Sequence, residues 1–516
     1  MTRAPATDLP IAVQPEARAF VRGYEAGAPQ VVWTRLVADL ETPVSAALKL
    51  VSDRPMSFLL ESVEGGSVRG RYSVIGFAPD IIWRAFGDKP EINRAPERSL
   101  EKFKPMKGGT LKALRALLDE SRIDLPASLP PMAAGVFGHM GYDTVRLVEK
   151  LPAEKPDPYG VPDSLLMRPT LMVIFDAVKD EMLVCTPVRP AKGVTADAAL
   201  AAATERLSEV VTALEGPLPH GPASEPDATS ATILPAGNTT PAQYMKMVRQ
   251  AKEYILAGDI FQVVLSQRFS TPFALPSFAL YRALRRTNPS PFLFHLDFGA
   301  YALIGSSPEI LVRARDGEVT IRPIAGTRPR GKTPEEDKAL AAELLSDEKE
   351  LAEHLMLLDL GRNDVGRIAE IGSVKVTDKF FLEYYSHVMH IVSNVTGRLD
   401  AEHDAIDALM AGFPAGTVSG APKVRAMQII DELERDKRGP YGGCVGYFSA
   451  TGQMDTCIVL RTALLKDGVM HVQAGAGIVM DSSPDMEQAE CRAKAEALFR
   501  AAEEAVRFAK SGRRRG

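Results

Sequence analysis

The sequence predicts an α+β protein with large, mainly antiparallel β-sheets and flanking helices. Two observations carry this prediction. Apolar, β-rich runs such as SLLMRPTLMVIFDAV (164–178) occur in both halves of the chain, and Ala/Leu-rich helical stretches lie between them without regular strand–helix alternation. This arrangement favours antiparallel pairing over the repeated βαβ units of a parallel sheet.

The elements are clearest in the second half of the chain. YMKMVRQAKEYILAG (244–258) is predicted to form a helix that ends at Gly258, and DIFQVVLSQRFS (259–270) is predicted to form a strand. Further strands are expected at residues 301–312, 456–465 and 470–480. Further helices are expected at residues 335–361 and 421–436.

The chain is predicted to have four parts. Residues 1–215 form an N-terminal region. Residues 216–240 are rich in Pro, Gly and Ser and lack apolar periodicity, so they form a linker or surface loop. Residues 241–505 form a second domain, and residues 506–516 form a basic tail. A chain of 516 residues suits more than one packed unit, because single cores rarely grow past about 250–300 residues.

Composition excludes several functional classes. The formal net charge is −5, so no basic field attracts nucleic acid or an anionic membrane. No apolar run approaches the roughly 18 residues of a membrane span, and the N-terminal MTRAPATDLPIAV lacks the apolar segment of a secretory signal. The four cysteines lack metal-like spacing. We therefore expect a cytoplasmic protein without nucleic-acid or membrane partners.

Two acidic pairs are candidate magnesium ligands. Glu350 and Glu353, and likewise Glu487 and Glu490, are three residues apart in predicted helices, so each pair lies on one helix face. Mg²⁺ prefers carboxylate oxygens and usually takes only one or two from protein. Either pair alone is typical of a solvated helix surface. The second pair, however, follows GAGIVM (475–480), which we interpret as a side-chain-poor turn where a ligand or another backbone approaches closely.

Basic residues and a glycine-rich loop could face an anionic substrate. Arg461 interrupts the apolar run 456–465, where a carboxylate would be its natural partner, although the solvent face of an edge strand is an equal alternative. Lys494 follows Glu490 by four residues. It could bind a second substrate carboxylate or form a simple surface Glu–Lys pair. GTVSGAPK (416–423) precedes a helix start, where free N–H groups favour anions.

A series of ordered motifs runs through the chain. The motifs are DIFQVVLSQRF, SSPE, RPIAGTRPRG, DEKELAEHLMLLDLGRND, YSHVMH, GTVSGAPKVRAMQII, YGGCVGYF, DTCIVLR and QAGAGIV. With these motifs the chain resembles the large subunit (component I) of anthranilate synthase, among the chorismate-utilising enzymes, most closely from Asp259 to Phe499. The resemblance implies that family's fold and its lyase reaction, in which chorismate and ammonia give anthranilate and pyruvate, with Mg²⁺ as cofactor. This reaction is the first step of tryptophan biosynthesis.

The resemblance assigns the metal and the general acid. It implies Glu353 and Glu490 as Mg²⁺ ligands, with Glu350 and Glu487 in support, so that the metal holds the ring carboxylate of chorismate. Glu309, in SSPE, matches the general acid that protonates the leaving ring hydroxyl. Such an acid must remain protonated near neutral pH, which requires burial or neighbouring negative charge.

The resemblance also assigns the residues around the substrate. His390 matches the histidine linked to loss of pyruvate, although a lone histidine among apolar residues more often belongs to a core. Arg461 and Tyr441 would hold the enolpyruvyl carboxylate, and Thr417 would lie beside the path of the nucleophile. The other implied substrate contacts are Gly326, Thr327, Gly475, Ala476 and Gly477.

Two positions separate the sister activities of this family. Isochorismate and salicylate synthases resemble the chain, but they carry a lysine at the position of Gln262, where it acts as a base that activates water. Glutamine cannot take a proton at neutral pH, whereas ammonia needs no such base. Aminodeoxychorismate synthase carries a nucleophilic lysine at Ala325, which here has no reactive group. Gln262 and Ala325 together indicate anthranilate formation.

Ammonia is expected to come from another subunit. Residues 442–446, with Cys444 at their centre, resemble the G-x-C-x-G nucleophile motif of glutamine amidotransferases. That thiol needs a histidine base oriented by a carboxylate, and no histidine here is followed two residues later by glutamate. We therefore expect a hetero-oligomer with a glutamine amidotransferase subunit (component II).

The same resemblance implies a tryptophan feedback site. LLES (59–62) matches the family's tryptophan-binding element, although it could simply end a core strand, and NPSP (288–291) matches its second wall. The next two residues are Phe and Leu where Tyr and Met are frequent, which keeps the lining apolar but loses a hydroxyl. A nearby arginine could add a charge. The residues expected around tryptophan are Glu61, Ser62, Arg71, Pro291, Phe292 and Leu293.

Two alternative functions stay open. A sister enzyme that makes isochorismate or aminodeoxychorismate would share the scaffold. A non-catalytic paralogue could retain only tryptophan sensing or a scaffolding role, but the intact acidic pairs, Arg461 and His390 argue against it.

Overall fold

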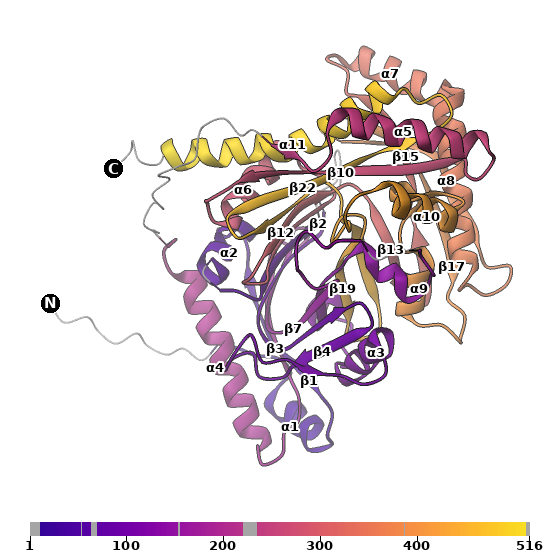
Figure 1. Cartoon of the computed structure of the whole chain (residues 1–516). Coiled ribbons are helices and arrows are strands. Elements are labelled where there is room, and N and C mark those ends of the chain that lie inside the picture. The colour runs from indigo at the N-terminus through magenta and orange to yellow at the C-terminus, as the bar shows by residue number, and fades with distance from the viewer. Residues whose placement is uncertain are drawn as a thin grey trace.

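The computed structural model describes residues 11–52, 54–62, 70–152, 155–219, 235–385 and 388–511. Its strands form one extended sheet system in which the named strands pair antiparallel, with helices packed around it (Figure 1). The predicted α+β class with mainly antiparallel sheet is confirmed. No helix in the described parts of the chain is long and apolar enough to cross a membrane.

The N-terminal region contributes the lower part of the sheet system in Figure 1. Its central strand β7 is apolar along almost its whole length and buried on both faces, which explains its unbroken hydrophobic run. Helix α4 packs on β1 and β8. The strands are β1 (Gln30–Val37), β2 (Ser57–Ser62), β3 (Tyr72–Phe86), β4 (Lys89–Asn93), β5 (Lys104–Pro105), β6 (Gly135–Met140), β7 (Ser164–Asp176) and β8 (Glu181–Val188); the helices are α1 (Ala17–Glu25), α2 (Pro43–Val51), α3 (Thr110–Glu120) and α4 (Ala196–Glu215).

The second half supplies the remaining elements. The strands are β9 (Ala236–Gly237), β10 (Gln262–Pro272), β11 (Phe292–Asp297), β12 (Ala302–Ser307), β13 (Ile310–Arg315), β14 (Glu318–Ile321), β15 (Ile324–Pro329), β16 (Lys375–Tyr384), β17 (Val388–Arg398), β18 (Gly420–Ala421), β19 (Cys444–Ser449), β20 (Met454–Ile458), β21 (Thr462–Lys466) and β22 (Val469–Ile478). The helices are α5 (Pro241–Leu256), α6 (Ser277–Thr287), α7 (Pro334–Ser346), α8 (Glu348–Gly366), α9 (Ala405–Gly412), α10 (Lys423–Leu433) and α11 (Pro484–Ser511).

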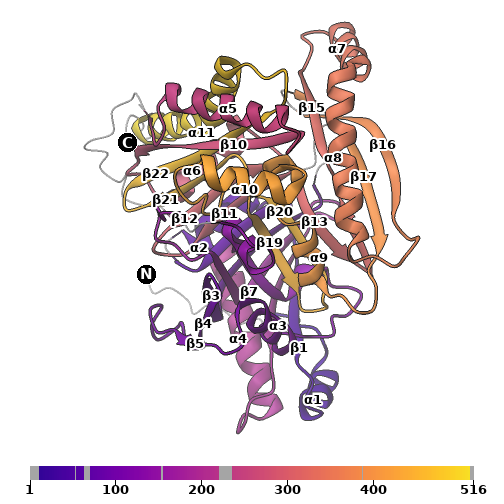
Figure 2. The same cartoon turned by 45° about the vertical axis from the view of Figure 1, so that its right-hand side comes forward.

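Two long helices carry the acidic pairs. Helix α11 lies across β22 and also packs on α5 and α6. Helix α8 packs against β15 and β17, beside the β16–β17 hairpin (Figure 2). The two helices thus pack on different strands of the sheet system.

The two halves of the chain share the sheet. Strand β2 pairs with β11, where Leu59 lies opposite His295, and β6 pairs with β19, where Met140 lies opposite Cys444. The end of the predicted linker also joins the sheet, because β9 pairs with β10. Residues 220–234 of that linker lie outside the described residues.

Several predicted elements are interrupted. The strand expected at 301–312 breaks around Pro308 into β12 and β13, and the helix expected at 335–361 breaks at Asp347. The carboxylate of Asp347 accepts hydrogen bonds from the backbone N–H groups of Lys349 and Glu350, so it begins a new helix as an N-cap. The prediction of a tail from residue 506 was wrong in part, because α11 continues to Ser511.

Candidate active site

A cavity of about 300 Å³ lies between helix α11, strand β17 and the short connecting segments that follow β12 and β20. It brings together four predicted site residues that are far apart in the sequence: His390, Arg461, Glu490 and Lys494. The other lining residues are Asn288, Pro289, Ser290, Pro308, Tyr385, Val388, Ala493 and Ala497.

Arg461 brings an unpaired cation to this cavity. The prediction of one strand over residues 456–465 was wrong, because the segment divides into β20 and β21. Arg461 lies between these two strands with a φ of 46°. Among the described residues its guanidinium has no hydrogen-bond or ion-pair partner, and burial lowers its pKa. A partly buried guanidinium without a counter-charge is a site for an anionic ligand group, and a carboxylate matches its geometry.

His390 is a neutral base on β17. Its Nδ1 lies 3.0 Å from the hydroxyl of Thr327 and 3.2 Å from the carbonyl oxygen of Gly326. A carbonyl only accepts, so Nδ1 carries the proton and Nε2 keeps its lone pair. Burial lowers the pKa of His390 to about 4. Gly326 sits in a β-bulge with φ of 76°, a conformation that favours glycine.

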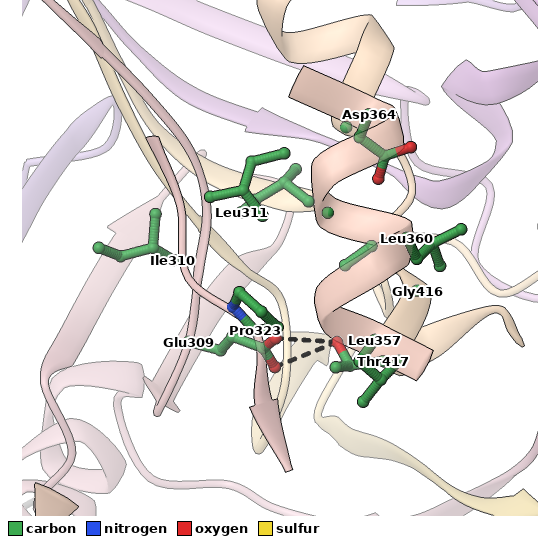
Figure 3. Close-up of a pocket in the computed structure, with 13 residues that line it drawn as sticks. Glu309, Ile310, Leu311, Pro323, Leu357, Leu360, Asp364, Gly416 and Thr417 are labelled. Atoms are coloured by element: carbon green, nitrogen blue, oxygen red, sulfur yellow. Dashed lines mark hydrogen bonds between the residues drawn. The ribbon is translucent and has the colours of Figure 1, made fainter. Parts of the chain in front are cut away.

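The buried Glu309 and the half-buried Thr417 form a hydrogen-bonded pair (Figure 3), and Glu309 directly follows Pro308, which lines the cavity. The Thr417 hydroxyl lies 3.0 and 3.1 Å from the two carboxylate oxygens of Glu309 and donates to them. Burial raises the pKa of Glu309 to about 8, although hydrogen bonds from Thr417 and from the Ile324 backbone N–H oppose the rise. Glu309 therefore carries a proton at neutral pH, as a general acid requires.

A second, smaller cavity touches the same pair. Its volume is about 20 Å³, enough for about one water molecule. Glu309, Thr417 and Leu357 lie at one end and Asp364 of α8 at the other, with Leu360 between them (Figure 3).

The carboxylates of the acidic pairs on α8 and α11 repel one another. Burial raises the pKa of Glu353, and the negative charges of Glu350 and Glu490 add to the rise. The pKa of Glu487 is also raised, first by burial and further by Glu490. A cation between Glu353 and Glu490 would relieve this repulsion.

The donor set fits magnesium better than a metal with many protein ligands. Among the described residues no group of three or more His, Cys, Asp or Glu could hold a metal. Glu353 and Glu490 would supply the one or two carboxylates that Mg²⁺ usually takes from protein. The two supporting residues differ, because Glu350 pairs with Arg328 at 3.0 Å while Glu487 lies on α11 one turn before Glu490.

Glycines on β22 let other side chains approach. The prediction of a turn at residues 475–477 was wrong, because these residues belong to a continuous strand in which Ala476 pairs with β10. A Cβ on Gly475 would lie 2.8 Å from the Tyr441 hydroxyl, and one on Gly477 would lie 2.8 Å from Nε2 of Gln262. That same Nε2 donates to Glu353 at 2.9 Å. The glycines are thus needed for close approach within the sheet.

Lys494 and Tyr385 complete the cavity wall. Lys494 lies 2.7 Å from Glu490 and donates to the Gly475 carbonyl at 3.1 Å, so it faces the cavity as well as its helical neighbour. Tyr385 was given no role from the sequence, although it is the first residue of the recognised YSHVMH motif. Its hydroxyl donates to Glu383 at 2.7 Å and its ring packs against His390. Tyr441 is not among the residues that line this cavity and lies against Gly475 instead.

A third cavity, of about 280 Å³, gathers the residues expected around tryptophan. Glu61, Ser62, Arg71, Phe292 and Leu293 all line it, whereas Pro291 does not. The guanidinium of Arg71 is paired with Asp176 at 3.0 Å. Glu61 is buried and paired with Arg285 at 2.5 Å. Three charged lining residues were missed: Asp455 lies between Arg313 and Arg315, at 3.1 and 2.7 Å.

Cys444 is buried and cannot act as a nucleophile. It lies on β19 with 2% of its surface exposed, and burial raises the pKa of its thiol to about 12. A nucleophilic cysteine needs a lowered pKa and access to substrate, so this residue does not provide a glutaminase centre.

Comparisons with known proteins agree with this geometry. Residues 70–500 match a family model described as chorismate binding enzyme. Anthranilate synthase component 1 of Cereibacter sphaeroides is 57% identical over 493 residues, which cover 95% of this chain and 98% of that protein. Anthranilate synthase component 1 of Thermus thermophilus is 48% identical and covers 90% of this chain and 96% of its own length.

Solved structures give the same assignment. The crystal structure of anthranilate synthase component I from Streptococcus pneumoniae has a TM-score of 0.72 and 38% identity, covering 90% of this chain and 99% of that one. MenF, the menaquinone-specific isochorismate synthase of Escherichia coli, has a TM-score of 0.67 at 18% identity over 94% of this chain and 98% of that one, a likeness of fold alone. This chain belongs to the chorismate-binding enzymes and, within them, to the anthranilate synthase component 1 family.

Proposed function

We propose that this chain is the large subunit of anthranilate synthase and converts chorismate and ammonia to anthranilate, pyruvate and water. One observation carries the proposal. A buried carboxyl that holds its proton at neutral pH, Glu309, lies beside a cavity lined by the neutral base His390 and by Arg461, a cation with no ion-pair partner among the described residues. These are the acid, the anion anchor and the base that the reaction needs.

The first half-reaction uses the acid. Arg461 and Lys494 anchor the substrate carboxylates. Mg²⁺, held by Glu353 and Glu490, would supply a Lewis acid for the ring carboxylate. Glu309 donates its proton to the ring hydroxyl, which leaves as water while the nitrogen of ammonia bonds to the ring. Gln262 stays neutral, which suits a nucleophile that needs no base.

The second half-reaction uses the base. Nε2 of His390 accepts the proton from the ring carbon that now bears nitrogen. The enolpyruvyl ether bond breaks, its methylene carbon takes a proton, and pyruvate leaves as the ring becomes aromatic. The hydrogen bond from Nδ1 to Gly326 keeps the accepting nitrogen aimed away from the strand.

Ammonia supply and regulation extend the proposal. The buried Cys444 supports a glutamine amidotransferase partner as the source of ammonia, with which this chain forms a hetero-oligomer in the cytoplasm. The third cavity supports feedback inhibition by tryptophan, because Ser62 and Phe292 lie together there as the resemblance implies. Asp455 would offer a carboxylate to the ligand's ammonium group.

Mass analysis of the product tests the proposed function. The purified chain is incubated with chorismate, ammonium and Mg²⁺, with a matched reaction that contains a chelator. Anthranilate and pyruvate should form only with Mg²⁺. Isochorismate or aminodeoxychorismate as the product would assign a sister activity. No turnover under any condition would favour a non-catalytic paralogue.

A further inference from the structure

A buried ion pair lies behind the active site, just after α10. Arg438 and Glu434 have side-chain exposures of 1% and 5%, and they meet through two hydrogen bonds of 2.9 and 2.5 Å. A buried ion pair is a poor source of stability, because desolvation offsets most of its attraction. Its geometry therefore calls for another explanation.

Arg438 binds two backbone carbonyls of active-site segments. Its Nη1 donates to the Val418 carbonyl at 2.6 Å, and its Nη2 donates to the Val264 carbonyl at 2.7 Å. Val418 directly follows Thr417, the hydrogen-bond partner of Glu309. One guanidinium thus joins the loop of the general acid to β10.

Glu434 ties the pair to the glycine strand. It accepts from the backbone N–H of Ser266 at 2.7 Å and from the Ser266 hydroxyl at 2.9 Å. Ser266 lies opposite Gly475 in the β10–β22 pairing. The guanidinium of Arg438 also lies over the ring of Tyr441, with 5.6 Å to the ring centroid. The pair therefore contacts three separate segments: the loop after Thr417, strand β10 and the segment of Tyr441.

We propose that Arg438 is a positioning residue that holds Thr417 against Glu309 through the Val418 carbonyl and holds the glycine strand through Glu434. The inference rests on the proposed function, in which Glu309 is the general acid. The guanidinium of Arg438 donates four hydrogen bonds in fixed directions, two to the Glu434 carboxylate and one to each carbonyl, which the three donors of a lysine ammonium cannot reproduce.

Loosening Thr417 has a definite consequence for the acid. The groups that face Glu309 are the Thr417 hydroxyl, the Ile324 N–H, Tyr385 and, across the small cavity, Asp364. Among these groups, Arg438 is bonded only to the segment that carries Thr417, through the carbonyl of Val418. The Thr417 hydrogen bond lowers the pKa of Glu309, so its loss raises that pKa and keeps the acid protonated to higher pH.

The test compares pH profiles of kcat for Arg438→Lys, Thr417→Val and the double variant. The fall of kcat at high pH should move upward by about one pH unit in each single variant and no further in the double variant. Arg438→Lys should also lower kcat on the order of 100-fold with a smaller change in KM. The matched control is Arg168→Lys, which alters a buried arginine paired with Asp80 at 2.7 Å in the N-terminal sheet. It should leave kcat and its pH profile unchanged.

Each other outcome has a definite meaning. A profile that moves in Thr417→Val but not in Arg438→Lys overturns the positioning role and leaves the proposed function intact. A profile unmoved in both overturns Glu309 as the acid. If Arg438→Lys does not fold, Glu434→Gln, which keeps the side-chain shape, should show the same upward shift. Failure of both to fold, beside a folded Arg168→Lys, would assign the pair to stability and overturn the inference.

Discussion

The protonation of Glu309 should be measurable in the stability of the protein without any substrate. Burial raises the pKa of this carboxyl from 4.5 to about 8. Between these values the folded chain holds a proton that the unfolded chain releases, so the contribution of Glu309 to the free energy of unfolding falls as pH rises. From pH 4.5 to 7 this loss amounts to about 3 kcal/mol, at about 1.4 kcal/mol per pKa unit.

The substitution Glu309→Gln removes this titration while keeping the shape of the side chain. Urea unfolding at several pH values between about 5 and 8 should show the variant gaining stability relative to the parent as pH rises. Glu318→Gln, at an exposed position on β14, is the control and should run parallel to the parent. The same Glu309 variant should lose about 100- to 10,000-fold in kcat.

Parallel unfolding curves for the parent and Glu309→Gln would refute this reasoning. They would mean that Glu309 ionises in the folded chain near its ordinary pKa, and an ionised carboxylate has no proton to give the leaving hydroxyl. In the parent enzyme, kcat should fall above pH 8, because burial raises the pKa of Glu309 to about 8 and the proton is lost above that pH.

Three further substitutions test the other parts of the site. Arg461→Gln should raise the KM for chorismate about 10- to 100-fold, because a charged hydrogen bond is lost; an unchanged KM in steady-state assays would argue against the anion anchor. Glu490→Gln should abolish activation in a Mg²⁺ titration and weaken Mg²⁺ binding in calorimetry, with the fold retained by circular dichroism; normal Mg²⁺ dependence would contradict the ligand assignment. Ser62→Ala should weaken inhibition by tryptophan without altering the uninhibited rate, and unchanged inhibition would count against the third cavity as its site.

Local spacing predicted the elements, and the motifs predicted which residues meet. The helix expected at 244–258 is present as α5, where a capping box between Thr240 and Gln243 sets its start. The acidic pairs lie on α8 and α11 as their spacing indicated. Periodicity alone could not reveal that Arg328, on strand β15, pairs with Glu350 on helix α8.

Two of the wrong predictions share one physical cause. Glycines at 475 and 477 suit either a turn or a strand that another group approaches closely, and only distant partners decide between the two. Here Tyr441 and Gln262 occupy the space that side chains at these glycines would need. Arg461 likewise looks like a strand residue by its apolar neighbours, yet its positive φ places it in a break. Both outcomes depend on tertiary contacts that no short window of sequence contains.

The segment before and within β11 links the substrate cavity to the third cavity. Asn288, Pro289 and Ser290 line the first, while Phe292 and Leu293 line the second. Leu293 lies opposite Glu61 in the β2–β11 pairing, and a slip by one residue would turn every side chain to the other face. If tryptophan in the third cavity weakens chorismate binding in the first, as the proposed feedback inhibition requires, chorismate must weaken tryptophan binding by the same factor, since the coupling free energy between two sites is reciprocal.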